Sequence, residues 1–373
     1  MRDIILSLII FGSLPFIFRR PYIGILLWCW LSYMNPHRMT WGWARYFSFA
    51  EIVAIVTLIS VIVSKENWRI PLTPLTVVWV AFIAWMGLTT YFALEPELAQ
   101  EFYLRILKIQ LTTFLTIMVM TTKQRLNLTL VVIVFSIAFF GVKGGIFTIL
   151  KGGEHKVWGP PGGFFEENNS LALALLMVMP LMYYLRSQTE KTWQRIALIG
   201  AMVLMGLAAL GTYSRGAMVG GVATLLFFFL KSDKKLAVAI GLVVVVPALV
   251  TFMPQKWVNR VSSITQQLKP APDDWSEMTG LPAPIESRDR LKMWPTDTSA
   301  AGRVNAWNYS INVANANITG AGLESWTEGP FATYAPIPND THSAHSIYFS
   351  VLADHGWIGL FLYLLIGVLM WRN

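Results

Sequence analysis

Charged residues are scarce in this chain of 373 residues. Asp, Glu, Lys and Arg make up 13% of it, against roughly 25% in soluble domains. Hydrophobic residues reach 55%, and the mean hydropathy is +0.52. This composition excludes an ordinary soluble domain. It predicts an all-α, polytopic transmembrane helical bundle, because a helix satisfies its own backbone hydrogen bonds in lipid.

Cysteine is nearly absent. Cys29 is the only one and lies in an apolar run, which excludes a disulfide framework and a thiolate metal site. The five histidines form no HExxH motif, and no carboxylate at ligand spacing supports a zinc pair of His342 and His345. We therefore expect no metal and no other cofactor.

The formal net charge of +8 does not indicate nucleic acid. Most of the basic excess lies in short loops between apolar runs, where it sets topology, and no basic stripe alternates with aromatic residues. The partners that this pattern predicts are membrane lipids.

Apolar runs long enough to cross a bilayer recur along the chain, so we expect about 11–12 spans. The runs cover residues 3–18, 22–34, 48–63, 74–93, 104–120, 127–150, 169–185, 196–212, 217–230, 236–253 and 346–371. The predicted organisation is a transmembrane helical body at 1–253, a polar loop at 254–344 and a C-terminal transmembrane helix at 345–373.

Lys and Arg gather in alternate loops, which predicts that these loops are cytoplasmic. The opposite set holds the segment around His37, the turn at Ser214-Arg215 and the long segment 254–344. These parts are therefore expected on the outer face of the membrane. Within 254–344, Trp257, Val258 and Val261 recur at helical spacing and predict an amphipathic surface helix over 256–268.

A second surface helix is expected where Val304, Trp307, Ile311 and Ala314 recur at the same spacing. Thr298 or Ser299 would cap this helix, which places Arg303 in or near its first turn.

Two arginines on the outer side are candidate ligands for an anion. Arg215 lies in a glycine-rich turn between two apolar runs; it is either functional, since charge at membrane depth is costly, or a snorkelling residue at a helix end. Arg303 is also open to a second interpretation, as a solvated charge on a surface helix. Together they suit a phosphate, which guanidinium binds through two hydrogen bonds.

His345 is the candidate general base. Ser343 would cap the last span, which places His345 in the first helical turn, where the helix dipole favours a neutral imidazole. A neutral imidazole can take a proton from a hydroxyl. The alternative is a polar residue at the membrane interface. His342, three residues earlier, is the less favoured base.

Three motifs occur in the order typical of a known family. The segment His345-Ser346-Ile347-Tyr348 is followed by Asp354-His355-Gly356-Trp357-Ile358-Gly359-Leu360. Ahead of it come the turn Ser214-Arg215-Gly216 and the element Arg303-Val304-Asn305-Ala306-Trp307. Together these motifs resemble those of the O-antigen ligase and O-antigen polymerase superfamily.

An N-terminal segment narrows the resemblance. Tyr33-Met34-Asn35-Pro36-His37-Arg38, followed by Trp41-Gly42, is similar to the branch of exosortase-associated O-glycosylation ligases. Two positions depart from the superfamily pattern. Ser346 stands where Asn is usual and Asp354 where Glu is usual, so no role is carried over to either residue.

The resemblance implies a GT-C-like glycosyltransferase of the bacterial inner membrane with its active site facing the periplasm. The donor would be a glycan on undecaprenyl pyrophosphate, and the acceptor a hydroxyl of lipid A-core or, in some branches, of a protein. Arg215 and Arg303 would bind the pyrophosphate, and His345 would deprotonate the acceptor. Tyr348 and His342 would contact the substrate. Transfer would be inverting and metal-independent.

Two alternatives remain open at this stage. A polymerase shares the donor and the chemistry but extends another lipid-linked chain; the long outer loop before the His-bearing helix favours a ligase. A transporter is the alternative of another class. Its ionisable candidates within spans are Glu51 and Lys143, and the glycines around Lys143 could form a gate or a kink. No internal repeat supports transport.

Overall fold

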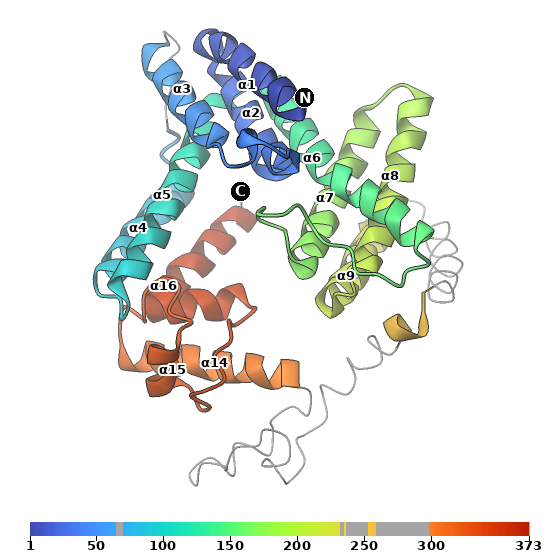
Figure 1. Cartoon of the computed structure of the whole chain (residues 1–373). Coiled ribbons are helices and arrows are strands. Elements are labelled where there is room, and N and C mark those ends of the chain that lie inside the picture. The colour runs from blue at the N-terminus through green and yellow to red at the C-terminus, as the bar shows by residue number, and fades with distance from the viewer. Residues whose placement is uncertain (65–69, 232–234, 236–252, 259–297, 373) are drawn as a thin grey trace. The chain divides into compact units, whose positions relative to one another are not determined.

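A computed structural model describes residues 1–64, 70–231, 235, 253–258 and 298–372, and every regular element among them is helical (Figure 1). The helices are α1 (Arg2–Arg19), α2 (Pro21–Met34), η1 (Pro36–Met39), η2 (Trp43–Arg45), α3 (Phe49–Val63), α4 (Pro74–Tyr91), α5 (Pro96–Val119), α6 (Lys123–Leu150), α7 (Asn168–Gln188), α8 (Thr192–Gly211), α9 (Arg215–Lys231), α14 (Thr298–Ala316), α15 (Glu328–Tyr334) and α16 (Ile347–Arg372). The predicted all-α class is confirmed.

Six of these helices, α4 to α8 and α16, are long and apolar enough to cross a membrane. Shorter apolar helices are α2, α3 and the Arg215–Phe227 part of α9. The chain is therefore a polytopic helical membrane protein. The helices agree with the predicted spans to within a few residues, except that α5 begins earlier, at Pro96. The predicted span 236–253 lies largely outside the described residues.

Polar residues and proline explain several helix ends. Thr73 caps α4 by accepting a hydrogen bond from Thr76 N, and Pro74 follows at the first helical position. Thr122 accepts from Arg125 N at the start of α6. Asn35 ends α2 in a left-handed conformation (φ 51°) that asparagine tolerates better than most residues.

The chain forms two compact units. Unit 1 comprises residues 1–68 and 115–263, and unit 2 comprises residues 69–114 and 264–373, each as far as it is described. One of the boundaries between them, after Phe114, falls within α5.

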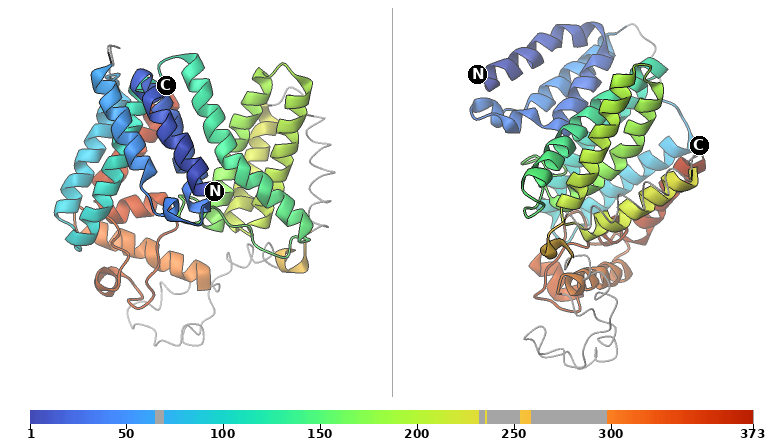
Figure 2. Two further views of the ribbon diagram at one scale, coloured as in Figure 1. Left: turned by 45° about the horizontal axis from the view of Figure 1, so that its top comes forward. Right: turned by 90° about the vertical axis from the view of Figure 1, so that its right-hand side faces the viewer.

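In unit 1, α6 packs closely on α8, and the two helices run side by side in both views of Figure 2. Glycines make this approach possible: a side chain at Gly145 would meet the backbone of Leu204, and one at Gly144 would lie 3.1 Å from Ala208 Cβ. The glycines around Lys143 do not interrupt α6, which continues as one helix from Lys123 to Leu150. These glycines serve helix packing instead.

Unit 2 contains α4, most of α5, and α14 to α16. Its core includes Tyr309, Phe331 and Ala353, which are buried between α14, α15 and α16. Tyr309 stacks on Phe331 with ring centroids 4.3 Å apart, and its hydroxyl donates to Ser325 O at 3.0 Å. Burial raises the pKa of Tyr309 above its ordinary value. The second helix predicted in the polar loop is present as α14, which packs on α16. Its buried face carries Ala306, Tyr309 and Val313 instead of the predicted stripe, and its place at the membrane surface stays a prediction.

Candidate functional site

His345 lies just before α16 rather than inside it. The helix begins at Ile347, and its first hydrogen bond runs from Ser350 N to Ser346 O at 2.9 Å. Ser346 therefore occupies the position that caps the helix, and the prediction that Ser343 caps it and places His345 in the first turn is wrong. Ala344, His345 and Ser346 therefore precede the helix instead of belonging to its first turn.

The backbone of His345 is in the left-handed region, with φ 47°. This conformation is costly for a residue with a side chain, by about 1–3 kcal/mol, and tends to occur at functional sites. The His345 side chain is exposed. A strained, exposed histidine thus lies two residues before the first residue of an apolar helix.

Helix α14 holds the segment before His345 in place. Trp307 Nε1 donates to Ala344 O at 2.9 Å, and the Trp307 ring stacks on Phe349 with centroids 5.0 Å apart. Asn305 is buried and donates to Ile337 O and Asp340 O at 2.9 and 3.0 Å. The backbone on the N-terminal side of His345 is therefore fixed by two side chains of one helix.

Arg303 lies on the same helix, α14. It is half-buried in the second turn of α14, one residue after Gly302. A side chain at Gly302 would lie 3.1 Å from the ring of His342, so this turn packs against the histidine segment. The structure thus places the turn that bears Arg303 against His342 in unit 2, and Arg303 lies near the first turn of the helix, as predicted.

His342 has a carboxylate partner that the sequence did not suggest. Its Nδ1 lies 2.7 Å from Asp340 Oδ1, across only one intervening residue. Among the described residues, no three His, Cys, Asp or Glu side chains are grouped so that they could hold a metal ion. Tyr348, the remaining predicted contact residue, is exposed on the first turn of α16, with its ring against Tyr363.

Helix α16 is broken at Gly356, where φ is 64° and ψ is −171°. The break frees backbone carbonyls, and residues distant in sequence bind them. Ala321 N donates to Ala353 O at 2.7 Å, and Gly322 N donates to Asp354 O at 3.1 Å. Trp85 Nε1 donates to His355 O at 2.9 Å. We call these three bonds the α16 latch.

The latch is tightly fitted. A side chain at Gly356 would meet the backbone oxygen of Ile318, so only glycine fits there. His355 is buried and its Nδ1 lies 2.7 Å from Thr89 Oγ1 on α4. The sequence analysis named His355 only as part of the motif that follows His345 and missed its contact with α4.

Arg215 lies in unit 1, as the first residue of α9. Ser214 precedes it and caps the helix, since Ala217 N donates to Ser214 Oγ at 3.1 Å. Tyr213 adopts φ 59°, and its buried hydroxyl donates to Gly153 O. Burial, with the nearby charge of Glu154, raises the pKa of Tyr213. The predicted turn at Arg215 is confirmed, with helix α9 beginning at the arginine itself.

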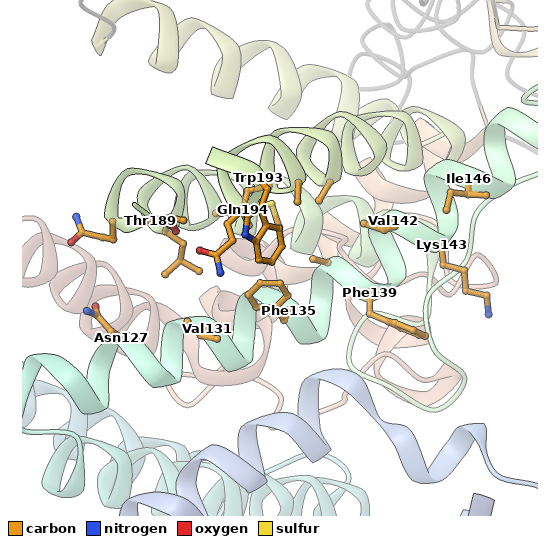
Figure 3. A pocket seen from close by; sticks show the side chains of 17 residues that line it. Asn127, Val131, Phe135, Phe139, Val142, Lys143, Ile146, Thr189, Trp193 and Gln194 are labelled. Carbon is orange, nitrogen blue, oxygen red and sulfur yellow. Dashed lines mark hydrogen bonds between the residues drawn. The ribbon is translucent and has the colours of Figure 1, made fainter. Parts of the chain in front are cut away.

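A groove of about 910 Å³ follows α6, α7 and α8 and contains none of these residues (Figure 3). Its lining is mostly apolar, with Phe135, Phe139 and Trp193 among the side chains labelled in Figure 3, and polar residues such as Asn127 and Gln194 also line it. Such a groove fits hydrocarbon better than a polar reactant. The candidate catalytic and binding residues lie on the other segments described above.

The described helices define a polytopic membrane protein in which an exposed histidine, His345, follows a segment that α14 holds in place. A model described as a family of unknown function (DUF5935) matches residues 1–190, just over half of the chain. A model described as O-antigen ligase matches residues 200–364, which include Arg215, Arg303 and His345. The chain belongs to the DUF5935 family, and its C-terminal part carries an O-antigen ligase domain at residues 200–364.

This assignment confirms the predicted superfamily and indicates a multi-pass membrane enzyme for glycosyl transfer of the ligase or polymerase type. The comparisons with curated proteins and with solved structures gave no match. The similarity to exosortase-associated ligases stays a prediction.

Proposed function

We propose that the protein is an O-antigen ligase of the bacterial inner membrane. It transfers a glycan from undecaprenyl pyrophosphate to a hydroxyl of lipid A-core at the periplasmic face, without a metal. The proposal is supported by the O-antigen ligase match over residues 200–364. The observation that carries it is the placement of His345, exposed, left-handed and fixed through Ala344 by Trp307.

In the proposed reaction, His345 takes the proton of the acceptor hydroxyl. The acceptor oxygen attacks the anomeric carbon on the face opposite to the pyrophosphate, and the bond from that carbon to the pyrophosphate oxygen breaks. The configuration at the anomeric carbon is therefore inverted. Undecaprenyl pyrophosphate leaves with the electron pair of the broken bond.

Arg215 and Arg303 bind the pyrophosphate and stabilise the negative charge that it gains on leaving. Guanidinium suits this task because it binds phosphate oxygens through two hydrogen bonds and stays charged. Removing one preorganised donor of this kind typically lowers the rate about 10²–10³-fold. His342, oriented by Asp340, and Tyr348 bind the acceptor.

The test is glycan transfer in reconstituted membranes that contain undecaprenyl-pyrophosphate-linked glycan, lipid A-core and a chelator. Wild type is compared with His345→Ala and with His155→Ala, a matched change of an exposed histidine outside the proposed site. We expect transfer by wild type and by His155→Ala, and none by a folded His345→Ala. Transfer by His345→Ala at the wild-type rate would exclude the histidine base.

The acceptor is decided by the product. If glycan joins a second lipid-linked glycan instead of lipid A-core, the protein is a polymerase; if it joins a protein, it is a protein O-oligosaccharyltransferase. If no acceptor is modified but lipid-linked glycan crosses the bilayer, the protein is a transporter.

A further inference from the structure

The turn Asn35–Arg38 has no role in the proposed reaction, although several contacts hold its backbone in place. It is a 3-10 turn, η1, that follows the left-handed Asn35. The adjoining segment is anchored to α1, because Asp3 Oδ1 accepts from Gly42 N and Ala44 N at 3.1 and 3.3 Å. The turn therefore has a fixed backbone.

A glycine-rich loop of unit 1, residues 159–166, packs on this turn. Asn35 Nδ2 donates to Pro161 O at 3.3 Å. The loop is closed on itself by Gly159 N, which donates to Glu166 O at 2.8 Å. A side chain at Gly159 would meet the backbone of Phe165, so the closure requires glycine.

Two opposite charges flank one glycine of this loop. Gly162 (φ 67°) donates its N–H to Glu166 Oε2 at 2.7 Å, and the guanidinium of Arg38 lies 3.3 Å from the place that a side chain at Gly162 would fill. Yet the side chain of Arg38 makes no hydrogen bond or ion pair with any residue that the structure describes. His37 Nδ1, on the same turn, is also buried there without a hydrogen-bond partner. Half-buried polar groups left unpaired are expected to meet a ligand or water.

The surroundings favour a sugar over an anion. Arg38 offers donors only and the Glu166 carboxylate offers acceptors only, so neighbouring hydroxyls of one sugar satisfy both. A phosphate would be repelled by Glu166. Large exposed aromatic residues flank the two segments in sequence, and an aromatic ring can cover the apolar face of a sugar. They are Trp41, Trp158 and Phe164.

We propose that Arg38 and Glu166 form a sugar-binding subsite for the glycan of the lipid-linked donor. This assignment rests on the proposed function, because it names the glycan of that reaction as the ligand. It gives the Asn35–Arg38 segment a role in glycan recognition that is separate from the chemical step.

The loop connects this subsite to Arg215. Two residues after Glu166, Asn168 Nδ2 donates to Thr212 O at 2.8 Å, and Arg215 follows three residues later. Chain reach therefore limits the separation of the Glu166 and Arg215 Cα atoms to about 25 Å. An oligosaccharide of a few sugars spans this distance, so the subsite recognises sugars near the pyrophosphate end of the donor glycan.

The experiment measures binding without transfer. The water-soluble glycan that mild acid releases from the strain's own polyprenyl-pyrophosphate pool is titrated into the purified full chain by calorimetry. The variants are Arg38→Ala, Arg38→Lys and Glu166→Gln, with Arg45→Ala as a control that removes the same charge from the next basic residue of the segment. Thermal melting of each variant shows that it is folded.

We expect wild type and Arg45→Ala to bind alike and the three other variants to bind about tenfold more weakly, as the loss of a charge-assisted hydrogen bond predicts. In the transfer assay the donor KM should rise about tenfold with kcat little changed. If Arg38→Ala does not fold, Arg38→Lys and the exposed Glu166→Gln decide the question.

The outcomes separate this inference from the proposed function. If wild type binds the glycan, the Arg38 variants bind it more weakly and wild type transfers nothing, the subsite is supported and the ligase assignment is rejected. Transfer by wild type with glycan affinity unchanged in all three variants, or no glycan binding at all, would reject the subsite. Inorganic phosphate is titrated in parallel. If phosphate displaces the glycan and Glu166→Gln strengthens phosphate binding, the site is an anion site and the sugar assignment is wrong.

Discussion

The indole of Trp307 donates a hydrogen bond to the carbonyl of Ala344, the residue directly before His345. Trp307→Phe removes this donor while the ring can still stack on Phe349. Because Ala344 is buried, its unpaired carbonyl should lower the free energy of unfolding by about 1–3 kcal/mol. Misplacement of His345 should lower kcat for glycan transfer about tenfold or more, with KM little changed.

The control for this change is Trp357→Phe. Trp357 makes a comparable bond, to Asn315 Oδ1 at 2.9 Å, at an exposed position on α16. It should alter stability by less than about 0.5 kcal/mol and leave transfer intact. Equal kinetic effects of the two variants would contradict a positioning role for Trp307.

Two substitutions at His345, whose backbone is left-handed, should have the same effect on activity and different effects on stability. His345→Gly and His345→Ala should both abolish transfer, because both remove the imidazole. Glycine adopts φ 47° without steric cost, so the glycine variant should be more stable than the alanine variant by about 1 kcal/mol. Denaturant unfolding of the two variants in detergent measures the difference. Alanine equal to or better than glycine would show that the strain at this position is negligible.

Glycines of α16 should differ sharply in their tolerance of a methyl group. Gly356→Ala places a Cβ against the backbone oxygen of Ile318 at a positive φ, whereas Gly367→Ala meets nothing within 4 Å. We expect the first to lower stability by at least about 2 kcal/mol and the second to have no destabilising effect. Melting temperatures of the two variants test this, and similar values would mean that the break in α16 is not required.

The cap of α9 is expected to matter for Arg215. Ser214→Ala removes the oxygen that accepts from Ala217 N, which should cost about 0.5–2 kcal/mol and loosen the first turn of the helix. Ser214→Gly should cost only a few tenths of a kcal/mol, because glycine is itself tolerated at helix caps. Unfolding and donor KM should therefore be worse for the alanine variant; the reverse order would exclude a capping role.

His37 should make the stability of the protein depend on pH. Burial, and then the charge of Arg38, lower the pKa of His37 from its ordinary value of about 6.5. Below about pH 6.5 the unfolded chain binds a proton that the folded chain binds less well. The stability from neutral His37 is thus complete above this pH and declines as the pH falls toward the folded pKa.

Between about pH 7.5 and pH 5.5, the melting temperature of wild type should therefore fall more steeply than that of His37→Gln. Melting curves at several pH values in one detergent provide the comparison. Parallel slopes for the two proteins would show that His37 does not titrate differently on folding.

The apolar spans could be predicted from sequence because each depends on local composition. Apart from the start of α5, the helix ends were placed to within a few residues for the same reason, as for α2, which covers Pro21–Met34 where 22–34 was predicted. Arg215 and its turn were also found, since glycines and a lone charge between apolar runs are a local signal.

The arrangement around His345 could not be predicted in this way. The start of α16 depends on a choice between Ser343 and Ser346, and both residues are suitable caps. The break at Gly356 is stabilised by donors more than 30 residues away, at Ala321 and Gly322, and no local pattern indicates such pairing. The glycines at 320, 322 and 356 were the available signal, because all three adopt positive φ.

The α16 latch also determines which parts of the chain are free to vary in length. Ala321 and Gly322 bind the carbonyls of α16, and Asn305 binds Ile337 and Asp340, so both ends of the segment that leads to His345 are tied. Residues inserted or deleted between these ties would displace the histidine. Insertions that precede Thr298 lie outside the tied segment. A change in chain length there should therefore leave the geometry at His345 unaltered.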